Sequence, residues 1–309
     1  MRCDNSCRPE AVRFSLVCPR PISPTVRERV REDFSKLCGN YSASTPQAID
    51  LDTFSLLATD SPICPIHLPA ALAPCMNYLH EQDINCAITY SDMALYGPQM
   101  IVTDVDSTFI TEEVIELLAE VAGSEDMVRE LTTRAMRGEL DFVESLAQRV
   151  ATLRGMPASA FEDIAANITL TEGADRLVRT AHENGARFTL VSGGFHEVAD
   201  LIAEPLGVDA ILANRLEVAG GVLTGKTVGT IIDREVKKSA VQSWAHDFDV
   251  PLNRVVAAGD GANDLGMMSV AGLSVAFCAK PVVREQADSF ISFPRLDAIA
   301  ALVGWETTE

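Results

Sequence analysis

Ile101-Val102-Thr103-Asp104-Val105-Asp106-Ser107-Thr108 is the stretch that decides the fold. Its β-branched and apolar residues predict a buried strand, and the strand ends at two carboxylates separated by one residue. Two neighbouring carboxylates repel each other unless a cation or a shared proton compensates their charge. Taken alone, the pattern also fits a solvated loop in which Asp106 or Ser107 caps the next helix. Partners elsewhere in the chain must distinguish these interpretations.

Length and charge limit the classes of function. The chain has 309 residues, of which 47% are hydrophobic, as expected for about two globular domains. Its formal net charge of -19 argues against binding to nucleic acid or to anionic membrane surfaces, since both depend on clustered Lys and Arg. The sequence contains no apolar run of about twenty residues, so a membrane span is not expected. An anionic substrate would need a locally positive pocket.

The N-terminus and the cysteines indicate the compartment. Residues 1–7 lead into charged residues and prolines without the apolar segment of a secretory signal, which predicts a cytoplasmic protein. All of the eight cysteines except Cys278 lie at or before Cys86, and in a reducing compartment we expect free thiols in small apolar positions. Cys3 and Cys7 have no Cys or His neighbour at zinc-site spacing, so no metal is expected there.

Residues 1 to about 96 differ from the rest of the chain, because they are rich in Cys and Pro and contain Gly39 as their single glycine. Their pattern predicts a small α+β domain, and it contains no catalytic constellation. The expected elements are strands at Val12–Val17, Thr53–Ala58 and Asn85–Thr89, and helices at Pro24–Leu37 and Ala70–His80.

A long helical segment follows Asp106. Glu112–Ala122 and Leu140–Leu153 have apolar residues at helical spacing, and the next convincing strand is Arg187–Val191. A crossover between parallel strands needs little more than one helix, yet about 80 residues intervene here. The surplus predicts a helical subdomain inserted at about residues 111–171.

The remainder alternates between strands and helices, which predicts an α/β fold with a doubly wound parallel sheet. In such sheets ligands bind outside the carboxyl ends of the strands, where Asp104, Ser192 and Asp260 all fall. Besides Arg187–Val191, the expected elements are strands at Val208–Leu212, Val255–Ala258 and Leu273–Phe277, a hairpin turning at Gly220-Gly221, and helices at Ala174–Asn184, His196–Pro205, Lys237–Phe248 and Leu296–Val303.

Four aspartates are expected to converge at that edge of the sheet. Such a cluster is tolerable around a hard cation, and a partly hydrated Mg²⁺ is the natural choice. An EF-hand starting at Asp104 would need Gly at Phe109, and the chain has neither a dinucleotide fingerprint nor a Gly-Lys-Ser/Thr phosphate loop. The four residues are Asp104, Asp106, Asp260 and Asp264.

A phosphate group could be held by Ser192, by the backbone N–H of Gly193 and by Lys237 as a point charge. Each side chain also has an ordinary interpretation, a helix cap for Ser192 and a solvated helix face for Lys237. Of the pair Lys237-Lys238, we expect the first to face the interior.

These motifs together resemble those of the haloacid dehalogenase-like phosphatases, and more closely the phosphoserine phosphatase family. The likeness covers about residues 100–303. It includes Asp104-Val105-Asp106-Ser107-Thr108, Ser192-Gly193-Gly194-Phe195, Lys237, Gly259-Asp260-Gly261-Ala262-Asn263-Asp264, Ala135-Met136-Arg137-Gly138-Glu139-Leu140-Asp141-Phe142, Ala213-Asn214-Arg215-Leu216 and Ala276-Phe277-Cys278-Ala279-Lys280-Pro281.

The resemblance implies a Mg²⁺-dependent phosphatase that hydrolyses O-phosphoserine to serine and phosphate, the last step of serine synthesis, through an aspartyl-phosphate. Asp104 would be the nucleophile, and Asp106 the general acid and then the base. Asp104 and Asp260 would bind the metal with the backbone carbonyl of Asp106, and Asp264 and Asn263 would support the site. Residues 97–309 would form the phosphatase core with its inserted helical cap.

The cap would choose the substrate. By the same resemblance, Glu113 would meet the ammonium group of phosphoserine and Arg149 its carboxylate, because Arg offers a planar fork to a carboxylate. Met136 and Phe142 would shield the site from water. Without the resemblance, Glu113 and Arg149 would be interpreted as parts of a solvated helix face.

Two alternatives remain open at this point. The substrate could be another small phosphoester, such as phosphohomoserine, for a phosphatase or phosphotransferase of the same fold. The chain could instead be an amino-acid-binding regulatory protein with an inactive phosphatase domain. Residues 1–96 are compatible with an ACT-like domain, but the turn 18–24 lacks the glycine usual at effector sites. A role of this domain in forming a homodimer is an equal alternative.

Overall fold

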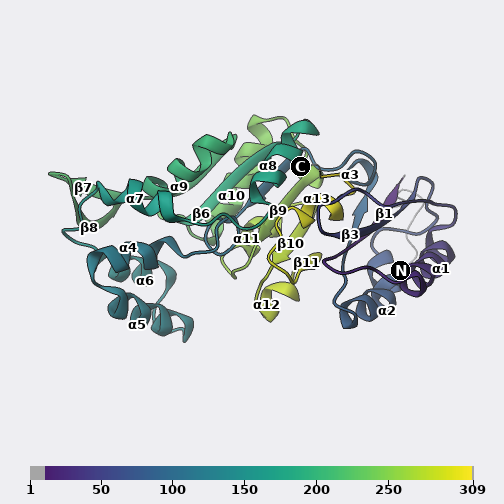
Figure 1. The fold of residues 1–309 in the computed structure, drawn as a ribbon, viewed down its shortest axis with the longest axis horizontal. Helices are drawn as coiled ribbons and strands as arrows, with labels where there is room; N and C mark the ends of the chain where they lie inside the picture. The colour runs from purple at the N-terminus through teal and green to yellow at the C-terminus, as the bar shows by residue number, and fades with distance from the viewer. Residues whose placement is uncertain (1–10, 308–309) are drawn as a thin grey trace.

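The computed structural model describes residues 11–307, without the side chain of Met136, so Cys3 and Cys7 lie outside the described residues. The molecule is elongated (Figure 1). The N-terminal domain lies at one end, a large sheet with its helices lies in the middle, and the cap helices lie at the other end. None of the helices within residues 11–307 is both long and apolar enough to cross a membrane.

The N-terminal domain is a four-stranded antiparallel sheet with two helices packed against it. The strand order is β2-β3-β1-β4. Helix α1 begins with Ser23, whose side chain accepts a hydrogen bond from the N–H of Val26, followed by Pro24. The sequence did not indicate β2. The elements are β1 (Val12–Cys18), α1 (Pro24–Cys38), β2 (Ser42–Ser44), β3 (Asp52–Ala58), α2 (Leu68–Glu81) and β4 (Asn85–Tyr90).

The central sheet has seven strands in the order β11-β10-β9-β5-β6-β7-β8. All neighbours are parallel except β7 and β8, so the predicted α/β parallel fold is confirmed, with one antiparallel edge strand. The strands are β5 (Met100–Thr103), β6 (Arg187–Phe195), β7 (Ala210–Ala219), β8 (Val222–Val228), β9 (Val255–Gly259), β10 (Leu273–Phe277) and β11 (Ser289–Ile291).

Strand β5 lies in the middle of this sheet and is buried on both faces. Its side chains alternate: Ile101 belongs to one hydrophobic core, and Met100 and Val102 belong to the other. The first core includes residues of α8 (Ala174–Glu183), α9 (His196–Ala203) and α13 (Ala298–Leu302), and the second includes residues of α10 (Arg234–Asp247), α11 (Leu265–Met268) and α12 (Pro281–Arg284).

Four helices lie in the inserted segment. The chain leaves and re-enters the core side by side, through an antiparallel bridge between Ile110 and Leu170. The sequence indicated α4 and α6, but it did not indicate α5 or α7. The helices are α4 (Val114–Ala122), α5 (Glu125–Met136), α6 (Phe142–Ala151) and α7 (Ala160–Asn167).

The hairpin β7–β8 turns at Gly220-Gly221, as the sequence predicted, but it reaches beyond the sheet to the cap. The N–H of Gly155 donates to the carbonyl of Leu223 at 2.8 Å, and the N–H of Leu223 donates to the carbonyl of Met156 at 2.8 Å. Figure 1 shows the tip of the hairpin beside the cap helices. The cap is therefore attached to the core at this hairpin as well as at its two connections.

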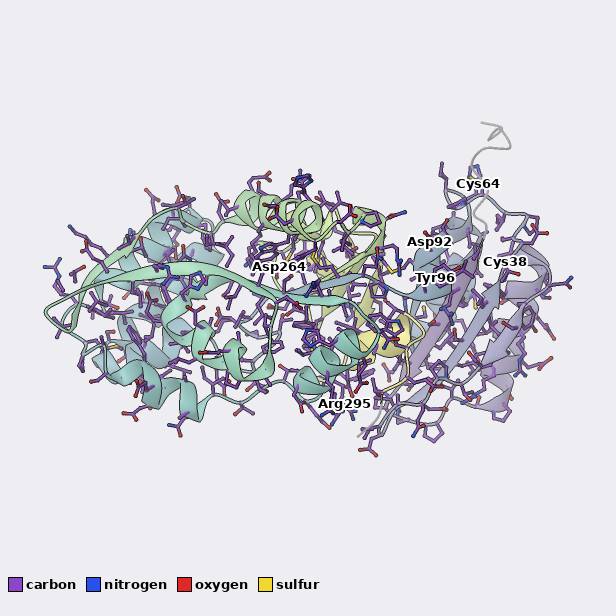
Figure 2. All side chains as sticks on the ribbon, turned by 90° about the horizontal axis from the view of Figure 1, so that it is seen from above. Cys38, Cys64, Asp92, Tyr96, Asp264 and Arg295 are labelled. Carbon is purple, nitrogen blue, oxygen red and sulfur yellow. The ribbon has the colours of Figure 1, made fainter. Side chains whose placement is uncertain are left out.

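The N-terminal domain is joined to the core by specific polar contacts as well as by packing. The N–H of Ser292 donates to Asn85 Oδ1 at 2.9 Å, next to the edge strands β4 and β11. Arg295, labelled in Figure 2, donates to the carbonyl of Ile49 at 2.6 Å and pairs with the buried carboxylate of Asp297. The short helix α3 (Ser91–Tyr96) ends this domain at Gly97.

Candidate active site

Asp104 lies directly after the last residue of β5. Its N–H donates to the carbonyl of Ala258 at 2.9 Å, so the parallel pairing with β9 holds the residue at the carboxyl end of the sheet. The chain then turns sharply, because the carbonyl of Val105 accepts hydrogen bonds from three following N–H groups and Ser107 adopts a positive φ of 55°. The turn directs the chain away from the sheet between Asp104 and Asp106.

Lys237 lies between two of the aspartates. Its Nζ is 2.8 Å from Asp104 Oδ1 and 2.7 Å from Asp264 Oδ1, and its side chain is fully buried. Helix α10 aims it inward, starting at Asp233, whose carboxylate accepts the N–H of Glu235 and of Val236. The inward direction that we predicted for Lys237 is confirmed, and Lys238 is only partly buried.

The charges of this group are not fully balanced by Lys237. Burial, and after it repulsion from Asp264, raises the pKa of Asp104 well above its ordinary value, although Lys237 lowers it. Burial lowers the pKa of Lys237, but the two carboxylates outweigh burial and raise it overall. One ammonium group is shared between two carboxylates, so negative charge remains uncompensated beside Asp104.

Asp260 adds a third carboxylate. One oxygen each of Asp104, Asp260 and Asp264 lies within 4.8 Å of the others. Thr108 Oγ1 donates to Asp260 Oδ1 at 3.3 Å, and burial, then repulsion from Asp264, raises the pKa of Asp260 to about 6. These three carboxylates, with the ammonium group of Lys237 beside them, provide a set of oxygen donors that fits a hard divalent ion. The carboxylate of Asp106 is not part of this group.

The loop after β9 makes room for Asp264, which lies near the middle of the molecule in Figure 2. Asp264 Oδ2 accepts the N–H of Gly261 at 2.9 Å, so both of its oxygens have partners within the protein. A Cβ on Gly259 would lie 2.4 Å from Asp264 Oδ2, which explains the glycine there. Asp264 therefore fixes Lys237 and the loop.

Asp106 faces different partners from Asp104. Its Oδ1 accepts the N–H of Val114 at 2.9 Å, and its Oδ2 accepts the hydroxyl of Ser192 at 3.1 Å. Burial and, after it, the charge of Glu113 raise its pKa to about 6, although both hydrogen bonds lower it. A carboxyl group with this pKa can hold or release a proton near neutral pH.

Ser192 and Gly193 lie within β6, whereas the sequence suggested that the strand ends at Val191. The strand continues because β6 shifts register against β7 after Val191 and pairs again at Phe195. The amide of Asn214 on β7 donates to the carbonyl of Gly193 at 2.8 Å and accepts the N–H of Ile232 at 2.9 Å. Asn214 therefore positions this segment, a role that we did not assign to it.

A cavity of about 660 Å³ opens above these residues between the core and the cap. Glu113 and Arg149 both line it, and the hydroxyl of Ser107 donates to Glu113 Oε1 at 2.8 Å. Burial lowers the pKa of Arg149, and Glu113, Asp106 and Glu116 oppose this effect. Phe142 lines the same cavity close to Gly193. The side chain of Met136 lies outside the described part of the chain.

Most of the residues that we singled out from the sequence therefore meet at one cavity. Asn263, Asp104, Asp106 and Asp260 line it, with Lys237 and Asp264 buried below. The sequence reasoning assigned no role to Arg234 and Lys280, which also line it. The signal for Arg234 was its position at the start of α10, three residues before Lys237. For Lys280 it was the motif ending Ala279-Lys280-Pro281.

The chain is similar to known proteins. Residues 101–269 match the family model of haloacid dehalogenase-like hydrolases. The chain is 51% identical over 185 residues to the phosphoserine phosphatase of Lactococcus lactis, covering 60% of this chain and 86% of that protein. It is 42% identical over 255 residues to phosphoserine phosphatase SerB2 of Mycobacterium tuberculosis, covering 80% of this chain and 62% of that protein. The alignment thus spans less than two thirds of that relative.

A solved structure of a phospho-aspartyl intermediate analogue of phosphoserine phosphatase has a similar fold. It has 39% sequence identity and a TM-score of 0.62, covering 65% of this chain and 97% of that one. The match therefore includes nearly all of the solved protein.

Proposed function

The chain belongs to the haloacid dehalogenase-like hydrolases, and within them to the phosphoserine phosphatases, and from this we propose that it hydrolyses O-phosphoserine to serine and phosphate. The observation that carries the proposal is the different environment of two aspartates two residues apart. Asp104 contacts a buried lysine, whereas Asp106 has a pKa of about 6 and accepts hydrogen bonds from the N–H of Val114 and the hydroxyl of Ser192. Nucleophile and proton donor need such a difference.

In the proposed reaction, a carboxylate oxygen of Asp104 attacks phosphorus and forms an aspartyl-phosphate. The bond from phosphorus to the seryl oxygen breaks, and Asp106 gives its proton to that oxygen. Asp106 then takes a proton from water as the water attacks phosphorus, which releases phosphate and regenerates Asp104. Lys237 and the hydroxyl of Ser192 are placed to meet phosphate oxygens, since both lie beside the two aspartates.

The oxygen donors of Asp104 and Asp260 would hold a divalent ion, and we propose Mg²⁺, with the backbone carbonyl of Asp106 as a further ligand. Asp264 would support the site rather than bind the ion directly, because both of its oxygens already have partners. When bound, Mg²⁺ reduces the repulsion between a carboxylate nucleophile and an anionic phosphate. Asn263 lines the cavity beside this loop and would act through water or phosphate.

The cap would recognise the amino acid part of the substrate. Glu113 and Arg149 line one cavity and carry opposite charges, which is the pair that an ammonium and a carboxylate group need. Phe142, which lines the same cavity, would help to exclude water. We further predict a cytoplasmic protein, and we keep an ACT-like or dimer-forming role as a prediction for residues 1–96.

The test is phosphate release from O-phosphoserine with Mg²⁺ by the full chain, compared with O-phosphohomoserine and O-phosphothreonine. We expect O-phosphoserine to have the highest kcat/KM. Asp104→Asn should abolish turnover and trapping of a phosphorylated enzyme, whereas Asp126→Asn on the exposed face of α5 should leave both unchanged. Full activity of Asp104→Asn, or no turnover of O-phosphoserine by the unmodified chain, would contradict the proposal.

A further inference from the structure

The cavity carries a charge distribution that is poorly matched to an anionic substrate. Three basic residues line it, against six acidic ones, and the whole chain has a formal net charge of -19. A phosphate dianion must enter this field before it reaches Lys237, which is fully buried and already paired with two carboxylates. The acidic residues are Asp104, Asp106, Glu113, Asp233, Glu235 and Asp260, and the basic ones are Arg149, Arg234 and Lys280.

Two of the three basic residues belong to the core rather than to the cap. Arg234 is the first residue of α10, and Lys280 directly precedes α12. Within the described part of the chain, neither side chain has an ion pair or a hydrogen bond, and both residues are exposed. Other cations of the core, such as Arg295 and Lys237, are paired with carboxylates. Arg234 and Lys280 therefore keep their full charge for a ligand.

The backbone holds both residues at the edge of the cavity. The carbonyl of Arg234 packs so closely on Gly266 that a Cβ there would lie 2.3 Å from it. The carbonyl of Lys280 accepts the N–H of Val283 at 3.0 Å and of Arg284 at 3.2 Å, and the side chain of Val283 is fully buried. Both positions are therefore fixed by backbone contacts within the core.

We propose that Arg234 and Lys280 form a cationic rim on the core side of the cavity, which attracts the phosphorylated substrate into it. The inference rests on the proposed function for the identity of the substrate, but it requires only that the substrate is a small phosphoester. Unpaired positive charges at the mouth of a cleft raise the local concentration of an anion and its rate of association. The rim offsets part of the repulsion from the six carboxylates.

Loss of the cationic rim should change different kinetic parameters from loss of the cap residues. Lys280 and Arg234 would act on capture of the substrate, so their loss should lower kcat/KM and raise KM while kcat stays nearly constant. The effect should fall with added salt, because the Debye length shrinks from about 30 Å at 0.01 M to about 3 Å at 1 M ionic strength. Loss of packing alone would not produce this salt dependence.

The experiment measures kcat and KM for O-phosphoserine in the full chain with Mg²⁺ at about 0.01 M and about 1 M ionic strength. The variants are Lys280→Gln, Arg234→Gln, Lys280→Arg and the double Gln variant. Lys238→Gln is the matched control, because it removes one positive charge from the same helix as Arg234 but does not line the cavity. Thermal melting of each variant checks that it is folded.

We expect Lys280→Gln and Arg234→Gln each to lower kcat/KM about three- to tenfold at low salt, and the difference to nearly vanish at high salt. Lys280→Arg should retain wild-type values, and Lys238→Gln should change kcat/KM far less than the rim variants. Product inhibition by inorganic phosphate should weaken in the rim variants by a similar factor.

The rim is refuted if Lys280→Gln and Arg234→Gln match Lys238→Gln at low salt, or if their losses fall on kcat and do not respond to salt. If Lys280→Gln does not fold, Arg234→Gln carries the same test. Failure of the proposed function looks different, because the unmodified chain would then not turn over O-phosphoserine. The rim would in that case be tested on whichever phosphoester the chain hydrolyses, since the phosphate is shared.

Discussion

Replacing Lys237 by Met removes the one buried cation of the carboxylate cluster and keeps most of the volume of the side chain. Asp104 and Asp264, which lie 2.8 and 2.7 Å from Nζ, then remain buried without a counter-charge. Removing one partner of a buried ion pair lowers the free energy of unfolding by about 3–5 kcal/mol. For a domain of this size, that corresponds to a fall in Tm of about 6–20 °C.

The loss of stability in Lys237→Met should depend on pH in a defined direction. Lys237 lowers the pKa of Asp104, so without it this pKa, already raised by burial and by Asp264, rises further. A carboxyl group whose folded pKa lies above its unfolded pKa of about 3.9 stabilises the fold fully below that pH, and the contribution is lost as the pH rises through the folded pKa. The loss in free energy of unfolding caused by Lys237→Met should therefore be small near pH 4 and reach its full value above neutral pH.

The assay is urea denaturation of both proteins in EDTA between about pH 4.5 and 8, where ΔG is obtained by linear extrapolation. Lys238→Met, at a partly buried neighbouring position without an ion pair, should change the free energy of unfolding by less than about 0.5 kcal/mol. With Mg²⁺ and saturating O-phosphoserine, Lys237→Met should lower kcat about 100- to 1000-fold.

A second substitution separates charge from packing. Asp264→Asn alone should destabilise the protein, because it weakens the pair with Lys237. In the Lys237→Met background it should stabilise the protein, because it removes one of the uncompensated negative charges. If the sign of the Asp264→Asn effect does not reverse, or if Lys237→Met is as stable as the unmodified chain above neutral pH, the charge balance described here is wrong.

Three further predictions concern other parts of the molecule. Gly194→Ala would place a Cβ 2.6 Å from Asp106 Oδ2, so we expect phosphoserine turnover to fall about 100-fold, and an unchanged kcat would contradict the need for this glycine. Arg295→Met removes one of the two arginines that pair with the fully buried Asp297 and should cost about 1.5–3 kcal/mol in urea unfolding, whereas an unchanged midpoint would refute the role of this pair. For Asp209, burial raises the pKa, but hydrogen bonds from Phe188, Arg187 and His182 outweigh it and lower the pKa overall. Its contribution to stability should be present above about pH 4 and lost as the pH falls through the folded pKa. Asp209→Asn should therefore have a lower free energy of unfolding than the unmodified chain at pH 7, and this difference should narrow in acid. A difference that widens in acid would contradict a lowered pKa of Asp209 in the folded protein.

Local patterns in the sequence predicted the central sheet and the convergence of its carboxylates well. The reason is that both depend on short-range features, namely β-branched runs, helical spacing and the rule that parallel strands carry ligands at their carboxyl ends. Lys237 was placed inward on the expectation that the first of two adjacent lysines faces the buried side of the helix. The meeting of these side chains at one end of the sheet followed from these features.

The elements that the sequence missed depend on long-range contacts. Strand β6 continues through Ser192-Gly193-Gly194, residues with little preference for strands, because Asn214 on β7 binds the carbonyl of Gly193. Strands β2 and β11 have three residues each, too few for a periodic signal. The attachment of the cap to the hairpin through Gly155 and Leu223 uses backbone groups, which carry no sequence pattern.

The turn at Val105 explains why one short motif yields two different carboxyl groups. In a continuing strand, Asp104 and Asp106 would point to the same face and share one environment. Because the chain leaves the sheet between them, Asp104 is directed to Lys237 on α10 and to the loop after β9. Asp106 is directed instead to β6 and to the start of the cap, where burial and then the charge of Glu113 raise its pKa and the N–H of Val114 lowers it. The protonation of Asp106 is thus set in part by the cap, whereas that of Asp104 is set by burial and by the charges of Asp264, Lys237 and Asp106.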